Sequence, residues 1–408
     1  LLDVNLREVA DTTTLRATKY RPNFALAYMG GGGGVGVATG NTSFGAAAGL
    51  AGGVDMLFDD ILGNNQLYAG LAVNGEIQDA AGQFSYINNK NRLGWGASFS
   101  HIPYRSLAYY GFRRTPLEVI PGRVDTFLEE VLGVQRLFQE RLSAFVFYPF
   151  SITKRIELGT AFEYYSTRVT EYSSYYDDFG FLVGNNRRRV PGSQNLSLYN
   201  VNAAYVGDNS FFGFTAPLQG WRYRVGVEQY FGDFNFTSLL LDGRRYFRLR
   251  PVTFAVRALG YGRFGGNSDQ VFPFFLSNSW FVRGYASNDL YTADPQLFNR
   301  MVGSKIAVGN AELRLPLFGP KPLGLIKFFL PADLNLFVDG GVAFFDTNDL
   351  ENPSSQTGVV HKPVFSVGAS MRFNLFGALV LEPFYALPLS ANKEARQWRW
   401  GLNILPGW

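Results

Sequence analysis

The feature that most constrains this chain is a two-residue alternation of side-chain character, which recurs from about residue 23 to the end. In the clearest segment, 304–315, the polar positions are Ser304, Asn310, Glu312 and Arg314, and the opposite face reads Ala307, Gly309, Ala311, Leu313 and Leu315. Segments 334–343 and 364–374 repeat this pattern, and in all three the carboxylates and guanidinium groups share one face. Because successive side chains of a strand point to opposite faces, the chain is predicted to be all-β.

Segment length and connection length favour a membrane barrel over a soluble sandwich, which is the alternative reading of the same alternation. Many segments have ten or more residues, about the length with which a tilted strand crosses a bilayer. Short turns at 63–65, 89–91 and 376–377 alternate with long polar connections near 104–124, 172–195, 265–301 and 345–361. Aromatic residues near strand ends fit interfacial girdles, namely Trp95, Tyr104, Trp221 and Trp398.

The predicted fold is therefore a 16-stranded antiparallel transmembrane β-barrel spanning residues 23–408, with apolar side chains facing outward. Residues 1–22 are predicted to be a polar periplasmic linker from a possible upstream domain. The expected strands cover 23–38, 46–59, 66–77, 82–89, 93–103, 125–150, 154–171, 195–207, 220–231, 235–248, 251–264, 302–316, 332–344, 362–375, 378–388 and 395–408.

Composition argues against several function classes. The net charge of +4 with 17% charged residues is too mild for a nucleic-acid-binding surface. No apolar run reaches 18 residues, so transmembrane helices are not expected. The chain has no cysteine, two histidines and no Gly-x-Ser-x-Gly motif, so we expect no enzyme, no cofactor and no metal site. Glu171, Asp177 and Asp178 lie near Arg187–Arg189, which favours a solvated charged loop over a metal site.

The connection 265–301 is unusually long and carries apolar residues at its centre, so it must pack against the rest of the fold. Arg283 stands at that centre, and an unpaired buried charge is costly. The alternation places Glu312, Phe337 and Asp339 on the inner face. Arg283 is therefore predicted to pair with the two carboxylates and to lie over the Phe337 ring. The alternative is that Arg283 is a solvated loop residue.

Four short motifs follow one another on these segments: Val282-Arg283-Gly284-Tyr285, Asn310-Ala311-Glu312-Leu313, Phe337-Val338-Asp339-Gly340-Gly341 and Gly368-Ala369-Ser370-Met371-Arg372. In this order they resemble the membrane domain of the outer-membrane protein assembly and translocation superfamily, of BamA and TamA type, also called the bacterial surface antigen domain. The resemblance implies that the long loop folds into the lumen and that residues 282–285 form a latch there. The implied lumen partners are Glu312, Phe337, Asp339, Gly341, Gly368 and Arg372.

The seam between the first and last strands is a second candidate site. The first strand contains Gly30, Gly31, Gly32, Gly33 and Gly34, and the last ends at Trp408. Glycine weakens a strand and leaves its register poorly specified. An opened edge recruits another strand by β-augmentation, so the seam is predicted to open. A bulge in a sealed barrel remains the alternative, and Pro406 limits how far the last strand pairs.

The resemblance implies a bacterial outer-membrane location and a role in inserting or translocating proteins. The implied partners are outer-membrane lipid and lipopolysaccharide, client outer-membrane proteins, and a periplasmic domain or partner subunits; nucleic acid is not among them. Two alternatives stay open: a passive diffusion channel, and a barrel that anchors an upstream or partner domain. The latch could also serve stability alone.

Overall fold

The computed structural model describes residues 20, 22–35, 50–73, 80–191, 195–271, 273–285, 294–320, 324–375 and 379–406. Most of them form one sheet of 19 strands, and a second sheet has two. The strands of the large sheet are β1 Phe24–Val35, β2 Leu50–Asp60, β3 Asn65–Val73, β4 Ala80–Asn88, β5 Gly94–Ile120, β6 Arg123–Ser151, β7 Lys154–Tyr176, β8 Leu182–Val190, β9 Asn195–Asp208, β10 Phe211–Phe212, β11 Pro217–Gly232, β12 Phe236–Leu249, β13 Val252–Phe264, β16 Lys305–Gly319, β17 Ile326–Lys327, β18 Ala332–Phe344, β19 Val364–Leu375, β20 Leu379–Pro388 and β21 Arg399–Pro406.

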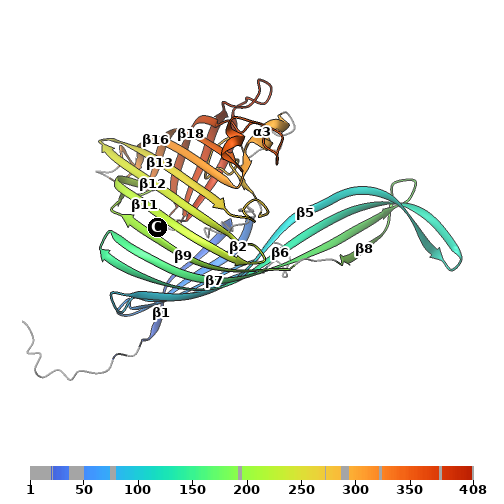
Figure 1. Cartoon of the computed structure of the whole chain (residues 1–408), viewed down its shortest axis with the longest axis horizontal. Coiled ribbons are helices and arrows are strands. Elements are labelled where there is room, and N and C mark those ends of the chain that lie inside the picture. The colour runs from blue at the N-terminus through green and yellow to red at the C-terminus, as the bar shows by residue number, and fades with distance from the viewer. Residues whose placement is uncertain are drawn as a thin grey trace, which may run out of the picture.

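The long strands pair antiparallel with their neighbours in the chain, from β1 with β2 to β20 with β21. The sheet has 19 strands where the sequence predicts 16, because β8, β10 and β17 add short ladders beside β7, β11 and β16. The sheet curls around an interior (Figure 1). Over the residues with a described position, no ladder joins β1 to β21.

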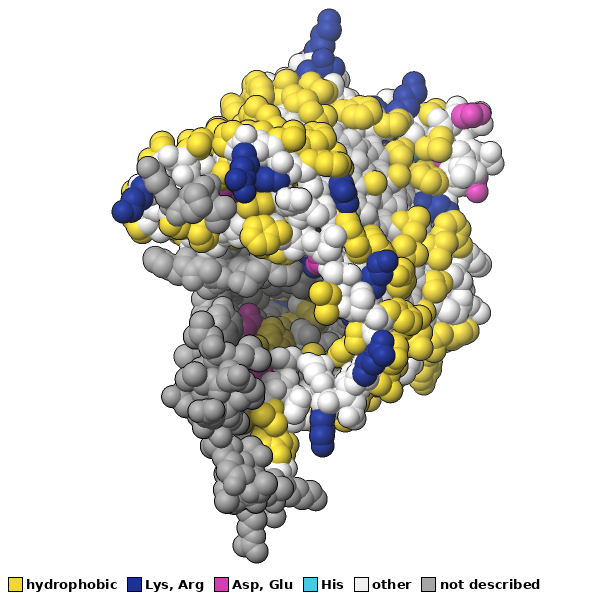
Figure 2. Space-filling view, turned by 90° about the vertical axis from the view of Figure 1, so that its left-hand side faces the viewer, with side chains coloured by type: hydrophobic (Ala, Val, Ile, Leu, Met, Phe, Trp, Pro, Cys, Tyr) yellow, Lys and Arg dark blue, Asp and Glu magenta, His cyan; other side chains and the backbone are white. Residues whose placement is uncertain are grey.

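The two faces of the curled sheet differ as the alternation predicts. On the outer face Leu336 is 54% exposed and Phe365 is 49% exposed, whereas their chain neighbours Phe337 and Ser366 are buried. Figure 2 looks at the short-turn end, where hydrophobic side chains lie around the outside and the centre is hollowed. The prediction of an apolar outer face and a polar inner face is confirmed.

The predictions of long loops at 104–124 and 172–195 are wrong, because most of the chain there forms strands. β5 and β6 continue past the other strands and turn only at 121–122, and β7 and β8 form a second hairpin where 172–195 is predicted to be a loop. We call this projecting sheet the arm: residues 104–134, 168–176 and 182–190 (Figure 1). Polar side chains such as Glu129, Glu171 and Ser173 occupy buried positions in the arm, so its sequence lacks the apolar–polar alternation by which strands are recognised.

The third predicted loop, 265–301, folds into the curled sheet, and we call it the inner loop. It contains β14 Phe274–Phe275, which pairs with β15 Val302–Gly303, and the short helix α3 Pro295–Arg300, capped by the Asp294 side chain. The fourth connection holds the 3₁₀ turn η3 Thr347–Leu350. Within the described ranges, no helix has the length and apolar character needed to cross a membrane.

Candidate functional site: a buried arginine in the inner loop

The central turn of the inner loop is held on the inner face by apolar side chains. Leu276 and Val282 are fully buried, in one cluster with residues of β13, β16, β18 and β19. Gly341 of β18 allows this close approach, since a Cβ there would lie 3.1 Å from both side chains. Full burial of a Leu or Val side chain contributes about 1.5–3 kcal/mol. Packing therefore fixes the position of the loop before any charge is considered.

The backbone then turns at Gly284, which has a φ of +91° that favours glycine. A Cβ on Gly284 would lie 2.9 Å from the Cβ of Ala386. The next residue, Tyr285, is fully buried; its hydroxyl donates to the carbonyl of Phe365 at 2.6 Å and accepts from the amide of Ser390 at 3.2 Å. This turn leaves the side chain of residue 283 directed at the inner wall.

Arg283 is 4% exposed and contacts three carboxylates. Its Nε and Nη2 donate to the two oxygens of Asp339, each at 2.8 Å, and its Nη2 and Nη1 lie 2.9 and 3.1 Å from Glu312 and Glu382. The guanidinium also lies over the Phe337 ring, 3.5 Å from its centroid. The predicted partners Glu312, Phe337 and Asp339 are thus brought together with Arg283.

Two further arginines complete the cluster. Arg372 lies 3.0 Å from both Glu312 and Glu382, and Arg314 lies 2.7 Å from Glu312. With Asp339, which pairs with Arg283, the cluster has three guanidinium groups and three carboxylates. Buried charges are stable only when paired and hydrogen-bonded, and removing one partner costs about 3–5 kcal/mol. We call these six residues the ion cluster: Arg283, Arg314, Arg372, Glu312, Asp339 and Glu382.

Gly368 of β19 leaves room for the Phe337 ring, over which Arg283 lies. A Cβ there would lie 2.6 Å from Cζ of Phe337 and 2.2 Å from the carbonyl oxygen of Tyr385. Gly368 directly opposes Phe337 in the ladder between β18 and β19. The predicted partners Gly341 and Gly368 thus act by allowing close approach, the first for the loop and the second for the ring.

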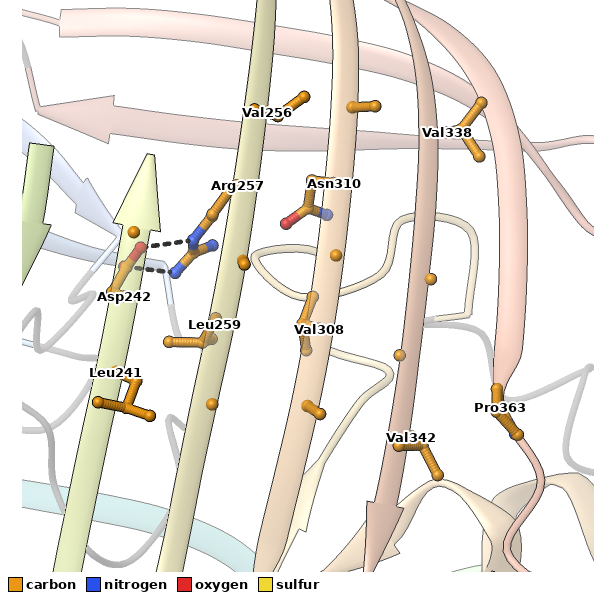
Figure 3. A pocket seen from close by; sticks show the side chains of 18 of the residues that line it. Leu241, Asp242, Val256, Arg257, Leu259, Val308, Asn310, Val338, Val342 and Pro363 are labelled. Carbon is orange, nitrogen blue, oxygen red and sulfur yellow. Dashed lines mark hydrogen bonds and ion pairs between the residues drawn. The ribbon is translucent and has the colours of Figure 1, made fainter. Parts of the chain in front are cut away.

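The wall also satisfies the backbone of the inner loop. Arg257 Nη1 donates to the carbonyl of Trp280 at 3.0 Å, and Asn310 Nδ2 donates to the carbonyl of Phe281 at 2.9 Å. Figure 3 shows Arg257 directed at Asp242 on the neighbouring strand, with which it forms two hydrogen bonds of 3.2 and 3.0 Å. Buried carbonyls need such donors. The wall therefore binds the backbone of the loop as well as the charge of Arg283.

Sequence reasoning missed Glu382, Asn403 and Ser279, which connect the cluster to the last strand. Glu382 Oε2 accepts from Asn403 Nδ2 of β21 at 3.4 Å, and Ser279 Oγ donates to Asn403 Oδ1 at 2.5 Å. A signal existed, because Glu382 is the one charged residue of the predicted strand 378–388. A single charge among apolar neighbours on a strand indicates a buried partner.

The predicted seam residues are only partly described. Gly30–Gly34 belong to β1 and pair with residues 51–55 of β2. Trp408 and residues 1–19 lie outside the described residues, so the terminal aromatic and most of the linker stay predictions. No group of carboxylates and histidines suited to a metal ion occurs in the described ranges. The members of the ion cluster pair with one another and with neighbouring side chains such as Asn310, Ser370 and Asn403, so the cluster joins the inner loop to the wall.

Comparison with known proteins agrees with this geometry. The Omp85 superfamily domain matches residues 134–404. Among solved structures, BamA from Haemophilus ducreyi lacking POTRA domains 1–3 has a TM-score of 0.54 at 13% identity, covering 89% of this chain and 68% of that one. CdiB from Acinetobacter baumannii has a TM-score of 0.52 at 13% identity, covering 88% of this chain and 56% of that one. No curated protein sequence matches significantly.

Proposed function

The chain belongs to the Omp85 superfamily, and from this premise we propose that it inserts or translocates proteins at the bacterial outer membrane. In the proposed working form, the sixteen long strands of the sheet close into a barrel whose inner face lines a lumen. Client polypeptides enter at the seam between β1 and β21. The process uses no cofactor and no chemical step, since the folding of client strands in lipid supplies the free energy.

The ion cluster is the observation that carries this proposal. It joins the inner loop to β16, β18, β19 and β20, and through Asn403 to β21. Arg283 is the one member from the loop, so it sets whether the loop and the last strands move together. We propose that this latch holds the β21 side of the seam while the β1 side gives way.

The contacts on the two sides of the seam support the proposal that the β21 side is held while the β1 side opens. The hairpin after β20 packs on the inner loop, with Ala391 and Ala395 in the buried cluster of Val282 and Tyr285. On the other side, β1 brings five glycines to its ladder with β2, where Gly32 and Gly33 face Gly53 and Gly52. Glycine pairs contribute no cross-strand side-chain contact. The β1–β2 edge is therefore the weaker of the two.

The test is insertion of a client barrel into liposomes that contain the full chain. Arg283→Ala leaves three carboxylates facing two guanidinium groups, so we expect the insertion rate to fall about tenfold or more. Leu198→Ala is the matched control, since Leu198 is fully buried away from the latch and its truncation costs a comparable 2–5 kcal/mol.

Equal losses in the two variants would show that Arg283 serves stability alone. An unchanged rate in Arg283→Ala would contradict the proposed role of the latch. Steady ion conductance of the wild-type chain in planar bilayers, without any effect on client insertion, would favour a passive channel instead.

A further inference from the structure

Three exposed arginines gather at the base of the arm, where it meets the barrel wall. Arg168 lies on β7, and Arg187 and Arg189 lie on β8. In the ladder between these strands, Arg189 opposes Thr170 and Arg187 opposes Tyr172. Residues 168, 170 and 172 share one face of β7, so all three guanidinium groups rise from the same face. Their Cβ atoms are separated by about 5–8 Å from one position to the next.

This face continues the apolar outer face of the barrel wall. Along β7 it reads Lys154, Ile156, Leu158, Thr160, Phe162, Tyr164, Ser166 and Arg168. Leu158 is 46% exposed and Phe162 is 37% exposed, as expected of side chains that face lipid. The apolar stripe of β7 therefore begins and ends with a cation.

The length of the stripe places Arg168 at a membrane border. Lys154 and Arg168 are 14 residues apart along the strand. At about 3.3 Å per residue and a tilt of about 45°, this corresponds to about 33 Å along the membrane normal. The apolar band of an outer-membrane barrel is about 25 Å tall. Both cations thus lie just outside the hydrocarbon, and Arg189 and Arg187 lie about 5 and 10 Å farther out.

The local charge balance favours an anion from outside the chain. The β6 residue opposite Arg168 is a fourth, buried arginine, Arg136, and the carboxylates of this face of β6 are Glu130 and Glu140. On the same face, both oxygens of Glu130 accept hydrogen bonds from tyrosine hydroxyls. Glu171 belongs to the opposite face, where it pairs with Arg188 at 2.9 Å. Four guanidinium groups thus share this face with two carboxylates, and an excess of positive charge attracts an anion.

We propose that Arg168, Arg187 and Arg189 bind the phosphate groups of lipid headgroups in the outer leaflet. The inference rests on the proposed membrane placement of the barrel. Arginine binds phosphate through paired N–H donors. Two of the guanidinium groups lie over aromatic rings, Arg168 at 5.0 Å from the Phe138 centroid and Arg187 at 5.3 Å from that of Tyr172. These rings orient the cations at the level where headgroup phosphates lie.

The test measures lipid binding by the full chain in detergent micelles that contain fluorescent lipid A. Lipid A with its phosphates is compared with dephosphorylated lipid A carrying the same acyl chains. The variant Arg168→Gln/Arg187→Gln/Arg189→Gln is expected to bind the phosphorylated form about tenfold more weakly or worse. The matched control is Lys90→Gln/Arg114→Gln/Arg123→Gln, which removes the same charge at exposed positions away from this base. It is expected to bind as the wild type does.

Equal binding of the two lipids, or equal affinity of the two triple variants, would overturn the proposal. Displacement of the lipid by millimolar inorganic phosphate would identify a free-anion site instead, and displacement by a polyglutamate peptide would identify an acidic polypeptide as the ligand. Circular dichroism and the heat-induced gel shift establish that each variant is folded. Client insertion is measured separately, so loss of lipid binding with normal insertion separates this site from the proposed function.

Discussion

Arg283 combines full burial with a complete set of partners, and glycines let its neighbours approach. Alternation along single strands predicts the face on which Glu312, Phe337 and Asp339 lie, which is why this part of the site could be derived from sequence. The lone charge of Glu382 on its strand indicated a buried partner, but its pairing with Arg283 could not be derived, because alternation assigns a face and not the height at which distant strands meet. That height depends on register across several ladders, which follows from turns and loop packing.

The glycine at 284 offers a direct test of this reading. Gly284→Ala places a side chain on a backbone with φ of +91° and 2.9 Å from the Cβ of Ala386. We expect a loss of about 1–2 kcal/mol from the backbone alone. Gly309→Ala is the control, since a Cβ there meets no atom within 4 Å. The midpoint of urea unfolding should fall for Gly284→Ala only, and equal midpoints would contradict the tight fit of the turn.

The arm is the element that sequence reasoning failed to find. Its polar residues pair with one another on a face where several of them are buried, as in the pair of Arg113 with Glu129 at 2.6 Å. Strands of the barrel wall were predictable because lipid and the interior impose opposite polarities on their two faces. The buried face of the arm holds polar residues, so hydrophobicity does not alternate along its sequence.

Stability of the arm should depend on pH through Glu129. The Arg113 guanidinium, with the hydroxyls of Ser173 and Thr115, lowers the pKa of Glu129 from 4.5 to about 2. The stabilisation is therefore complete above pH 4.5 and is lost as the pH falls through about 2. Spin labels at Gly111→Cys and Gly184→Cys, where a new side chain meets no atom within 4 Å, report arm mobility.

We expect these labels to stay immobile at pH 4 and to become mobile near pH 2. In Glu129→Gln, which has no charge to lose, mobility should be raised already at neutral pH and vary little with pH. Glu118→Gln, near the tip of the arm, is the control. Labels whose mobility rises between pH 5 and pH 4 in the wild type would refute the assigned pKa shift.

The whole molecule is a curled sheet that surrounds the inner loop, and its two ends, β1 and β21, are held by different numbers of contacts. The β20–β21 end is tied to the inner loop by Tyr285, Ser279 and the ion cluster. The β1 end is tied to β2 through a ladder rich in glycine. The sheet and the polarity of its faces follow from the alternation of the sequence, whereas the inward fold of the loop was implied by its apolar centre and by the family resemblance. That the β21 end is held more firmly than the β1 end could not be predicted from sequence, because it depends on contacts between distant segments.

A disulfide across the seam tests most directly whether the chain works by opening between its first and last strands. The chain has no cysteine, so Leu26→Cys in β1 can be combined in turn with Trp400→Cys or Leu402→Cys in β21, all at exposed positions. We predict that the oxidised pair stops client insertion and that reduction restores it, with each single variant active throughout. Normal insertion by the fully oxidised protein would contradict the claim that the chain works by opening between its first and last strands.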